Sequence, residues 1–174
     1  RFYTGPSYKP INEFLRALGD EERREAALDQ ENTFAQTIRH ICDAFYKLSS
    51  SGECSEAERT WRAINGKLPD DFFVSDDKGM VTYLEYGLSS TSCDEQVIED
   101  FRDRTKPNLK ITVLSVKNEI TACHQGVPLD WLSEFSGEQE VLFPPLTMFE
   151  VRDKRKDEDG LAVYLDVVAH YNFE

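Results

Sequence analysis

Two glutamates in the C-terminal third of the sequence stand two residues apart, directly before an apolar run. They are Glu138 and Glu140, and the run 141–143 ends at Pro144-Pro145. Side chains two positions apart on a strand share one side of the backbone, so we expect both carboxylates at the rim of a sheet. A pair of acids held there can stabilise a bound cation. The alternative is a solvated acidic turn, because charged side chains usually face water and the chain has 33 acidic residues.

Two further polar features interrupt predicted apolar strands upstream of this pair. Arg62 lies inside the strand predicted at 60–64, and Ser90-Thr91-Ser92 ends one strand just before a predicted helix. An arginine offers a rigid fork of donors that suits phosphate oxygens. Taken singly, a strand arginine is usually an edge or outward residue and a Ser-Thr-Ser run is usually a helix cap. The glutamate pair, Arg62 and Ser90-Thr91-Ser92 occurring together indicate a more specific function than each does singly.

The elements that must position these side chains follow from the apolar periodicity. Steps of three and four predict helices at about 10–18 and 33–48, and a charged helical stretch at 21–28 follows the stop and cap at Gly19-Asp20. A further helix ends near Phe101, with Val97, Ile98 and Phe101 facing inward and with Ser92 and Glu95 as its capping box. Alternation predicts strands at about 60–64, 80–86, 88–92, 109–116, 140–143, 147–151 and 161–170, with an apolar loop at 127–135 and a charged hairpin tip at 153–160. Helices first and strands afterwards predict an α+β fold.

Composition limits the class of protein and its partners. A chain of 174 residues fits one domain, which we divide into a helical lobe at 1–58 and a β-rich core at 59–174. The net charge of −13 argues against a nucleic-acid partner. No apolar run approaches the roughly 20 residues of a membrane-spanning helix. Cys42, Cys54, Cys93 and Cys123 form no metal-ligand pattern with the histidines, so we expect free thiols and no metal.

The compartment is not fixed by the sequence. The chain starts at Arg1 without a basic and then apolar leader, so we expect it to be part of a longer protein. Free thiols and the absence of an Asn-x-Ser/Thr acceptor favour an intracellular domain. A secreted effector or toxin is the alternative.

The order of these motifs resembles the arginine-specific mono-ADP-ribosyltransferases, the class with Arg, Ser-Thr-Ser and Glu-x-Glu motifs that includes ecto-enzymes and bacterial toxins. The resemblance extends over nearly the whole chain and is carried by Trp61-Arg62-Ala63, by the run 86–92 and by the run 136–145. It implies the ADP-ribosyltransferase fold, in which N-terminal helices precede a two-sheet β-sandwich with an NAD-binding cleft. One departure is Ala63, where the family usually has glycine next to the nicotinamide, and it implies weaker NAD binding.

The resemblance also implies an activity and roles for the motif residues. The chain would transfer ADP-ribose from NAD, its co-substrate, to an arginine of a target protein and release nicotinamide, without a metal. Arg62, Ala63, Ser90 and Glu140 would bind NAD, and Glu140 would stabilise the oxocarbenium-like transition state.

Glu138 would orient the incoming guanidinium, while Phe135 and Trp131 would pack on its plane. Two alternatives stay open. One is an NAD glycohydrolase on the same fold, and the other is a catalytically idle module that binds ADP-ribose or a protein.

Overall fold

Three helices form the N-terminal third of the molecule. The computed structural model describes residues 8–51, 55–67, 74–115, 125–129, 131–133, 136–158 and 162–170. The helices are α1 (Tyr8–Leu18), α2 (Glu21–Leu28) and α3 (Ala35–Ser50), and they agree with the predicted ranges within two residues at each end. Asp20 starts α2 because its side chain accepts hydrogen bonds from the backbone N–H groups of Glu22 and Arg23.

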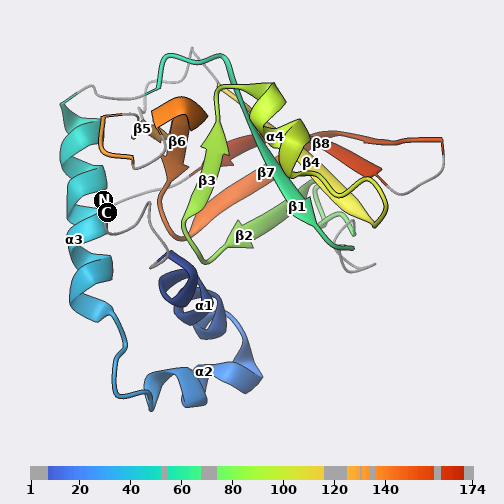
Figure 1. Cartoon of the computed structure of the whole chain (residues 1–174). Helices are drawn as coiled ribbons and strands as arrows, with labels where there is room; N and C mark the ends of the chain where they lie inside the picture. Colours follow the sequence, from blue (N-terminus) through green and yellow to red (C-terminus); the bar gives the residue numbers. More distant parts are fainter. Residues whose placement is uncertain are drawn as a thin grey trace.

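The rest of the described chain forms one mixed sheet and a short helix. The elements are β1 (Arg59–Asn65), β2 (Val81–Glu85), β3 (Ser89–Ser92), α4 (Glu95–Phe101), β4 (Asn108–Leu114), β5 (Val127–Pro128), β6 (Glu140–Phe143), β7 (Thr147–Lys156) and β8 (Ala162–His170). The strand order is β2-β7-β8-β4-β1-β3-β6-β5. Only β4 and β8 are parallel among these neighbours (Figure 1). The predicted α+β class is confirmed.

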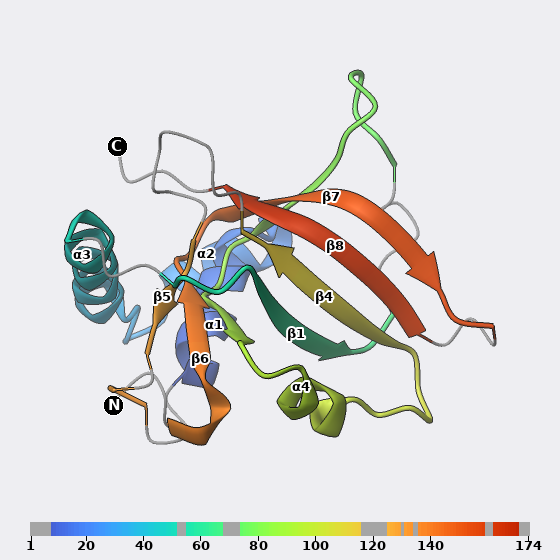
Figure 2. The same ribbon diagram turned by 90° about the horizontal axis from the view of Figure 1, so that it is seen from above.

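The strands belong to one hydrogen-bonded sheet rather than to the two sheets that we expected. The reason lies at the junction of β1 and β3, which pair only through Trp61 and Ser92. By contrast, β1 pairs with β4 along its full length. The sheet therefore consists of two groups of strands joined at one point, with β3, β6 and β5 beside the helices and the long strands β7, β8 and β4 curving away from them (Figure 2).

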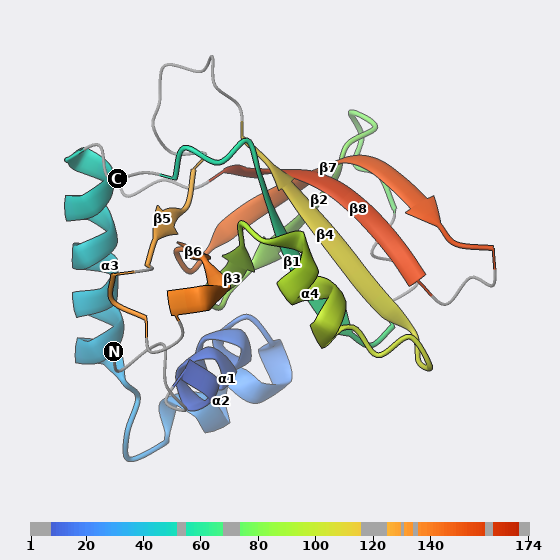
Figure 3. The ribbon, with the colours of Figure 1, turned by 45° about the horizontal axis from the view of Figure 1, so that its top comes forward.

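Strand β6 is buried on both faces, and this decides where Glu140 lies. Val141 and Phe143 belong to the hydrophobic core formed by residues of the long strands. Leu142 belongs to a second core, together with Ile11 of α1 and Phe45 of α3. Figure 3 shows these two helices beside β5 and β6. Because successive side chains alternate, Glu140 shares the helix-facing side with Leu142.

Three details of the prediction around α4 and β7 are wrong. The N-cap of α4 is Asp94, whose side chain accepts from the N–H of Gln96, so Ser92 forms no capping box. Phe101 is 60% exposed and is not part of the core. Strand β7 continues to Lys156, because its charged second half pairs with β8 while its side chains stay in water.

Candidate active site

A cleft of about 620 Å³ opens between the N-terminal helix and the junction of β1 with β3. This volume lies within the roughly 300–1,000 Å³ that is usual for small-molecule sites. The lining side chains come from six segments and are Tyr8, Asn12, Arg16, Arg62, Ala63, Asn65, Leu88, Ser90, Thr91, Ser92, Val97, Ile98, Phe101, Glu138 and Glu140. The structure thus brings together all three polar features that the sequence singled out.

Ser90 and Glu140 form the innermost polar contact of the cleft. Strands β3 and β6 are antiparallel, with Ser92 opposite Glu140 and Ser90 opposite Leu142. Ser90 and Glu140 are therefore diagonal neighbours on one face. The Ser90 Oγ donates to Glu140 Oε1 at 2.6 Å, and Glu140 is only 7% exposed. The result is a carboxylate held in place and largely shielded from water.

Glu138 reaches the same cleft by a different route from the one predicted. It is not on a strand, because Ser136–Glu138 form a single 3-10 turn and β6 begins only at Glu140. The residue between them, Gln139, has a φ of 45°, which breaks the extended backbone. The two carboxylates line one cleft, but a turn and a strand position them separately.

Two arginines, Arg16 and Arg62, line one wall of the cleft. Both contact the carboxylate of Glu85. Arg16 on α1 donates from Nε and Nη2 to the Glu85 carboxylate at 3.0 and 3.3 Å. Arg62 Nη2 lies 3.7 Å from Glu85 Oε2. Burial raises the pKa of Glu85, but the hydrogen bond from Arg16 and the charge of Arg62 outweigh it and lower that pKa below its usual value. This wall is the positive part of an acidic molecule.

Helix α1 is fastened to the turn that leads into β3. The side chain of Asn12 donates to the backbone oxygen of Leu88 at 3.2 Å and accepts from its N–H at 2.8 Å. At Gly87 a Cβ would lie 3.0 Å from Asn12 Oδ1 and 3.3 Å from Arg16 Nε, so glycine permits this close approach. The contact fixes Arg16 relative to the Ser-Thr-Ser strand.

Helix α4 supplies the apolar side of the cleft through Val97, Ile98 and Phe101. Its opposite face is held by an ionic network on Glu99. Lys110 Nζ of β4 donates to the Glu99 carboxylate, and Arg102 Nη1 donates to it at 2.9 Å. The helix therefore keeps its apolar residues turned towards the cleft.

Sequence reasoning placed the motif residues in the cleft but missed part of its wall. The sequence patterns do not single out Tyr8, Asn12 and Arg16, although their spacing of four puts them on one stripe of α1. Glu85 gave no local signal, because its importance comes from chain segments distant in sequence. Trp131 is 68% exposed and does not line the cleft. Phe135 lies outside the described residues.

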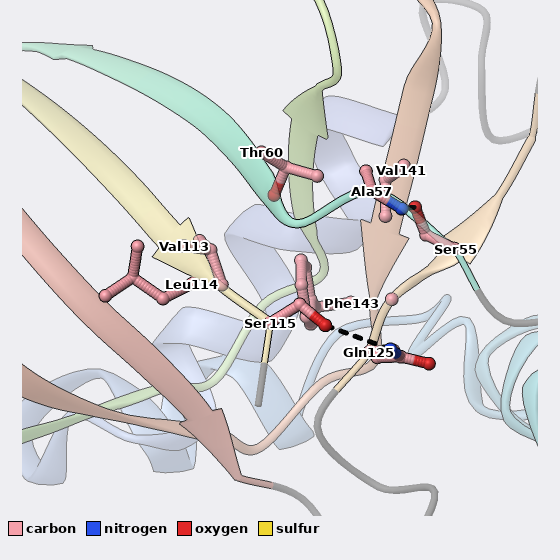
Figure 4. Close-up of a pocket in the computed structure, with 10 residues that line it drawn as sticks. Ser55, Ala57, Thr60, Val113, Leu114, Ser115, Gln125, Val141 and Phe143 are labelled. Atoms are coloured by element: carbon pink, nitrogen blue, oxygen red, sulfur yellow. Dashed lines mark hydrogen bonds between the residues drawn. The ribbon is translucent and has the colours of Figure 1, made fainter. Parts of the chain in front are cut away.

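A second hollow lies on the other side of β6 and is too small for a nucleotide. Its volume is about 10 Å³, roughly the space of one water molecule. Figure 4 shows Thr60, Val141 and Phe143 around it, with Gln125 Nε2 donating to Ser115 Oγ at 2.9 Å. A third hollow, of about 400 Å³, is lined by residues that include Glu99, Arg102 and Tyr164 and by none of the three motifs. The large cleft, which all three motifs line, is thus the candidate for ligand binding.

The described part of the chain offers no metal site and no membrane-spanning helix. No group of three or more His, Cys, Asp or Glu side chains there is arranged to hold a metal ion. Cys42 and Cys93 form no disulfide bond, and both are half-buried. Among the described helices, none is long and apolar enough to cross a membrane.

Comparisons with known proteins identify the family. The family model described as NAD:arginine ADP-ribosyltransferase matches residues 2–171. A search of curated proteins finds no match.

Solved structures share the fold at low sequence identity. The Vis toxin of Vibrio splendidus is 20% identical with a TM-score of 0.64, and the match covers 98% of this chain and 70% of the toxin. Exoenzyme S from Pseudomonas aeruginosa is 22% identical with a TM-score of 0.63, covering 94% and 68%. The eucaryotic mono-ADP-ribosyltransferase ART2.2 is 13% identical with a TM-score of 0.61, covering 98% and 63%.

Proposed function

The chain belongs to the NAD:arginine ADP-ribosyltransferase family, and from this premise we propose that it transfers ADP-ribose from NAD to arginine side chains of target proteins and releases nicotinamide. The observation that carries the proposal is the hydrogen bond from Ser90 to the buried Glu140, in a cleft that also contains Glu138 and two arginines. Residues 1–174 would form the catalytic domain, with 1–58 as its helical lobe and 59–174 as its NAD-binding core.

Binding of NAD uses the positive wall of the cleft. Arg62 and Arg16 offer guanidinium donors to the diphosphate, which carries negative charge at neutral pH. The cleft is large enough to hold part of the NAD molecule. Ala63 and Ser90 line the same cleft as the two arginines. Exoenzyme S has been solved with Carba-NAD and ART2.2 with NADH, which supports a nicotinamide dinucleotide as the ligand here.

Bond cleavage depends on Glu140. The glycosidic bond breaks with its electron pair going to the pyridinium nitrogen, so nicotinamide leaves as a neutral molecule and needs no general acid. Positive charge then develops on the anomeric carbon and ring oxygen, as in glycoside cleavage. A buried carboxylate stabilises that charge strongly because little water screens it. The bond from Ser90 keeps Glu140 in position while the charge develops.

Transfer to arginine depends on Glu138. A guanidinium is always protonated in water and is a poor nucleophile. Glu138 lines the same cleft as Glu140, so its carboxylate orients the guanidinium and accepts the proton that leaves as the new carbon–nitrogen bond forms. The Vis toxin has been solved with agmatine, a small guanidinium compound, which supports this class of acceptor.

Two isosteric substitutions test the separate roles of Glu140 and Glu138. Glu140→Gln should lower nicotinamide release about 10²–10³-fold, since it removes the stabilising charge. Glu138→Gln should lower formation of the ADP-ribosyl–agmatine adduct about 10²-fold, to a small residual amount, but leave NAD hydrolysis, because cleavage itself does not use Glu138. Liquid chromatography of nicotinamide, ADP-ribose and adduct measures all three products.

Glu150→Gln is the matched control for both variants. Glu150 on β7 is an ion-paired glutamate with 16% of its side chain exposed, and it does not line the cleft. It should leave both reactions within about twofold of the unmodified chain. Full adduct formation by Glu138→Gln would contradict the role of Glu138.

A further inference from the structure

Ser92 joins the end of β3 to the turn that carries Glu138. Its side chain is buried, with the residue only 3% exposed. The Ser92 Oγ donates to the backbone oxygen of Glu138 at 2.6 Å and accepts from the N–H of Asp94 at 2.9 Å. The backbone oxygen of Asp94 is a more distant partner at 3.2 Å. A hydroxyl has one proton, and the shorter contact directs it to Glu138.

The turn at Glu138 has little else to fix it among the described residues. Glu138 belongs to no strand, so no ladder hydrogen bond sets its backbone. Gln139 has a φ of 45°, a conformation that costs about 1–3 kcal/mol when a non-glycine residue adopts it. A second bond, from the N–H of Cys93 to the oxygen of Gln139 at 3.1 Å, holds this residue. The position of Glu138 is thus imposed by β3 rather than by β6.

The bond-cleaving pair is held independently of this tether. Ser90 and Glu140 are fixed by the register of β3 with β6 and by their own side-chain hydrogen bond. Loss of the Ser92 hydroxyl leaves this backbone register in place, including the pairing of Ser92 with Glu140, so we expect it to act first on Glu138.

We propose that Ser92 is a positioning residue that fixes Glu138 and thereby decides whether arginine or water receives the ADP-ribose. This inference rests on the proposed function and adds a determinant of its acceptor choice. A carboxylate displaced by about 1 Å can lose roughly 10²-fold in rate, because orientation supplies much of the acceleration. Water needs no such orientation, so hydrolysis continues when Glu138 is misplaced.

The test measures the ratio of ADP-ribosyl–agmatine adduct to free ADP-ribose. Ser92→Ala should lower this ratio at least about tenfold, with total nicotinamide release reduced much less than transfer. The matched control is Ser89→Ala, the same substitution in the same strand. Ser89 is fully buried, does not line the cleft, and its hydroxyl finds no hydrogen-bond partner in the described part of the chain. The ratio of adduct to free ADP-ribose in Ser89→Ala should stay within about twofold of that of the unmodified chain.

A double variant tests whether Ser92 acts through Glu138. In a Glu138→Gln background, Ser92→Ala should cause no further loss of adduct, because the side chain it positions is already inactive. If Ser92→Ala alone does not fold, Ser92→Cys keeps a weak donor of similar shape and should give an intermediate ratio.

Three results would overturn the inference. They are an unchanged ratio in Ser92→Ala, an equal change in Ser89→Ala, or a further loss in the Glu138→Gln background. Failure of the proposed function is a different result, in which the unmodified chain itself forms no adduct, and the inference would fall with it.

Discussion

At the scale of single residues, the site depends on two carboxylates that are close in sequence but held in different ways. Glu140 starts a strand covered on both faces, and its carboxylate is bonded to Ser90. Glu138 sits on a one-turn helix and is held through its backbone by Ser92. A rigid acid suits cleavage of NAD, which always presents the same bond. An acid on a tethered turn suits acceptors that arrive on different proteins.

The first prediction concerns Ala63, which stands next to Arg62 where the family usually has glycine. Its methyl group lines the cleft, so removing it should let the nicotinamide end approach the backbone more closely. Ala63→Gly should therefore tighten binding of carba-NAD severalfold, as measured by calorimetry. Glycine in a strand should also cost about 0.5–1 kcal/mol of unfolding free energy. Unchanged or weaker binding would show that the methyl group does not limit the approach.

At the scale of elements, α4 is positioned mainly by charge. Glu99 accepts hydrogen bonds from Lys110, Arg102 and Arg104, and the side chains of the first two are only 9% and 5% exposed. The same helix presents its apolar residues to the cleft. A loss of this anchor would therefore affect both stability and the shape of the binding site.

The second prediction tests this anchor. Glu99→Gln should lower the free energy of unfolding by about 2 kcal/mol, between the values for exposed and buried pairs, because it leaves cations without their counter-charge. Glu95→Gln is the control, since Glu95 bonds the same Lys110 but 54% of its side chain is exposed. Its cost should stay below about 1 kcal/mol in urea unfolding. Equal losses in the two variants would contradict a special role for Glu99.

The third prediction is the pH dependence of the same contact. Burial raises the pKa of Glu99, but the hydrogen bond from Lys110 and the charge of Arg102 lower it overall below its usual 4.5. A depressed pKa in the folded state stabilises the protein above the unfolded value, and this contribution is lost as pH falls through the folded one. The stability difference between the unmodified chain and Glu99→Gln should thus shrink below about pH 4.5. A stability difference that grows on acidification would contradict a lowered pKa of Glu99 in the folded state.

Local patterns predicted the elements well and their contacts poorly. The helix at 35–50 follows from apolar steps of three and four, the helix at 21–28 from a charged stretch after the cap at Asp20, and β6 from an apolar run bounded by proline. The capping box at Ser92 failed because α4 begins only at Glu95, so that Asp94 is its N-cap, and the Ser92 hydroxyl donates to the turn at Glu138, which is distant in sequence. Glu85 could not be found for the same reason, since its partners come from α1 and β1.

At the scale of the whole molecule, the charge of −13 contrasts with a cleft wall that carries two arginines. Under the proposed function, the two arginines would bind the diphosphate, and the overall negative charge would attract basic acceptors. The single sheet was not predictable, because only one residue pair joins its two groups of strands and alternation does not reveal which edges meet. The three motifs nevertheless converge, since they lie on β1, β3 and the start of β6, which are neighbours in the sheet order.

The fourth prediction follows from this charge. Transfer to an arginine-rich peptide should lose about tenfold in kcat/KM between low salt and about 0.2 M salt, because long-range attraction is screened beyond a Debye length of roughly 10 Å at 0.1 M. Agmatine carries less charge and should lose only about twofold. Initial rates at several salt concentrations give both values, and equal salt dependence would exclude electrostatic steering of the acceptor.

The central claim is that this chain joins ADP-ribose to a guanidinium. The most direct test incubates it with NAD and agmatine and analyses the products by mass spectrometry. We expect an ADP-ribosyl–agmatine adduct that accumulates with the released nicotinamide and is absent with Glu140→Gln. Nicotinamide and free ADP-ribose without any adduct would contradict arginine transfer and identify an NAD glycohydrolase instead.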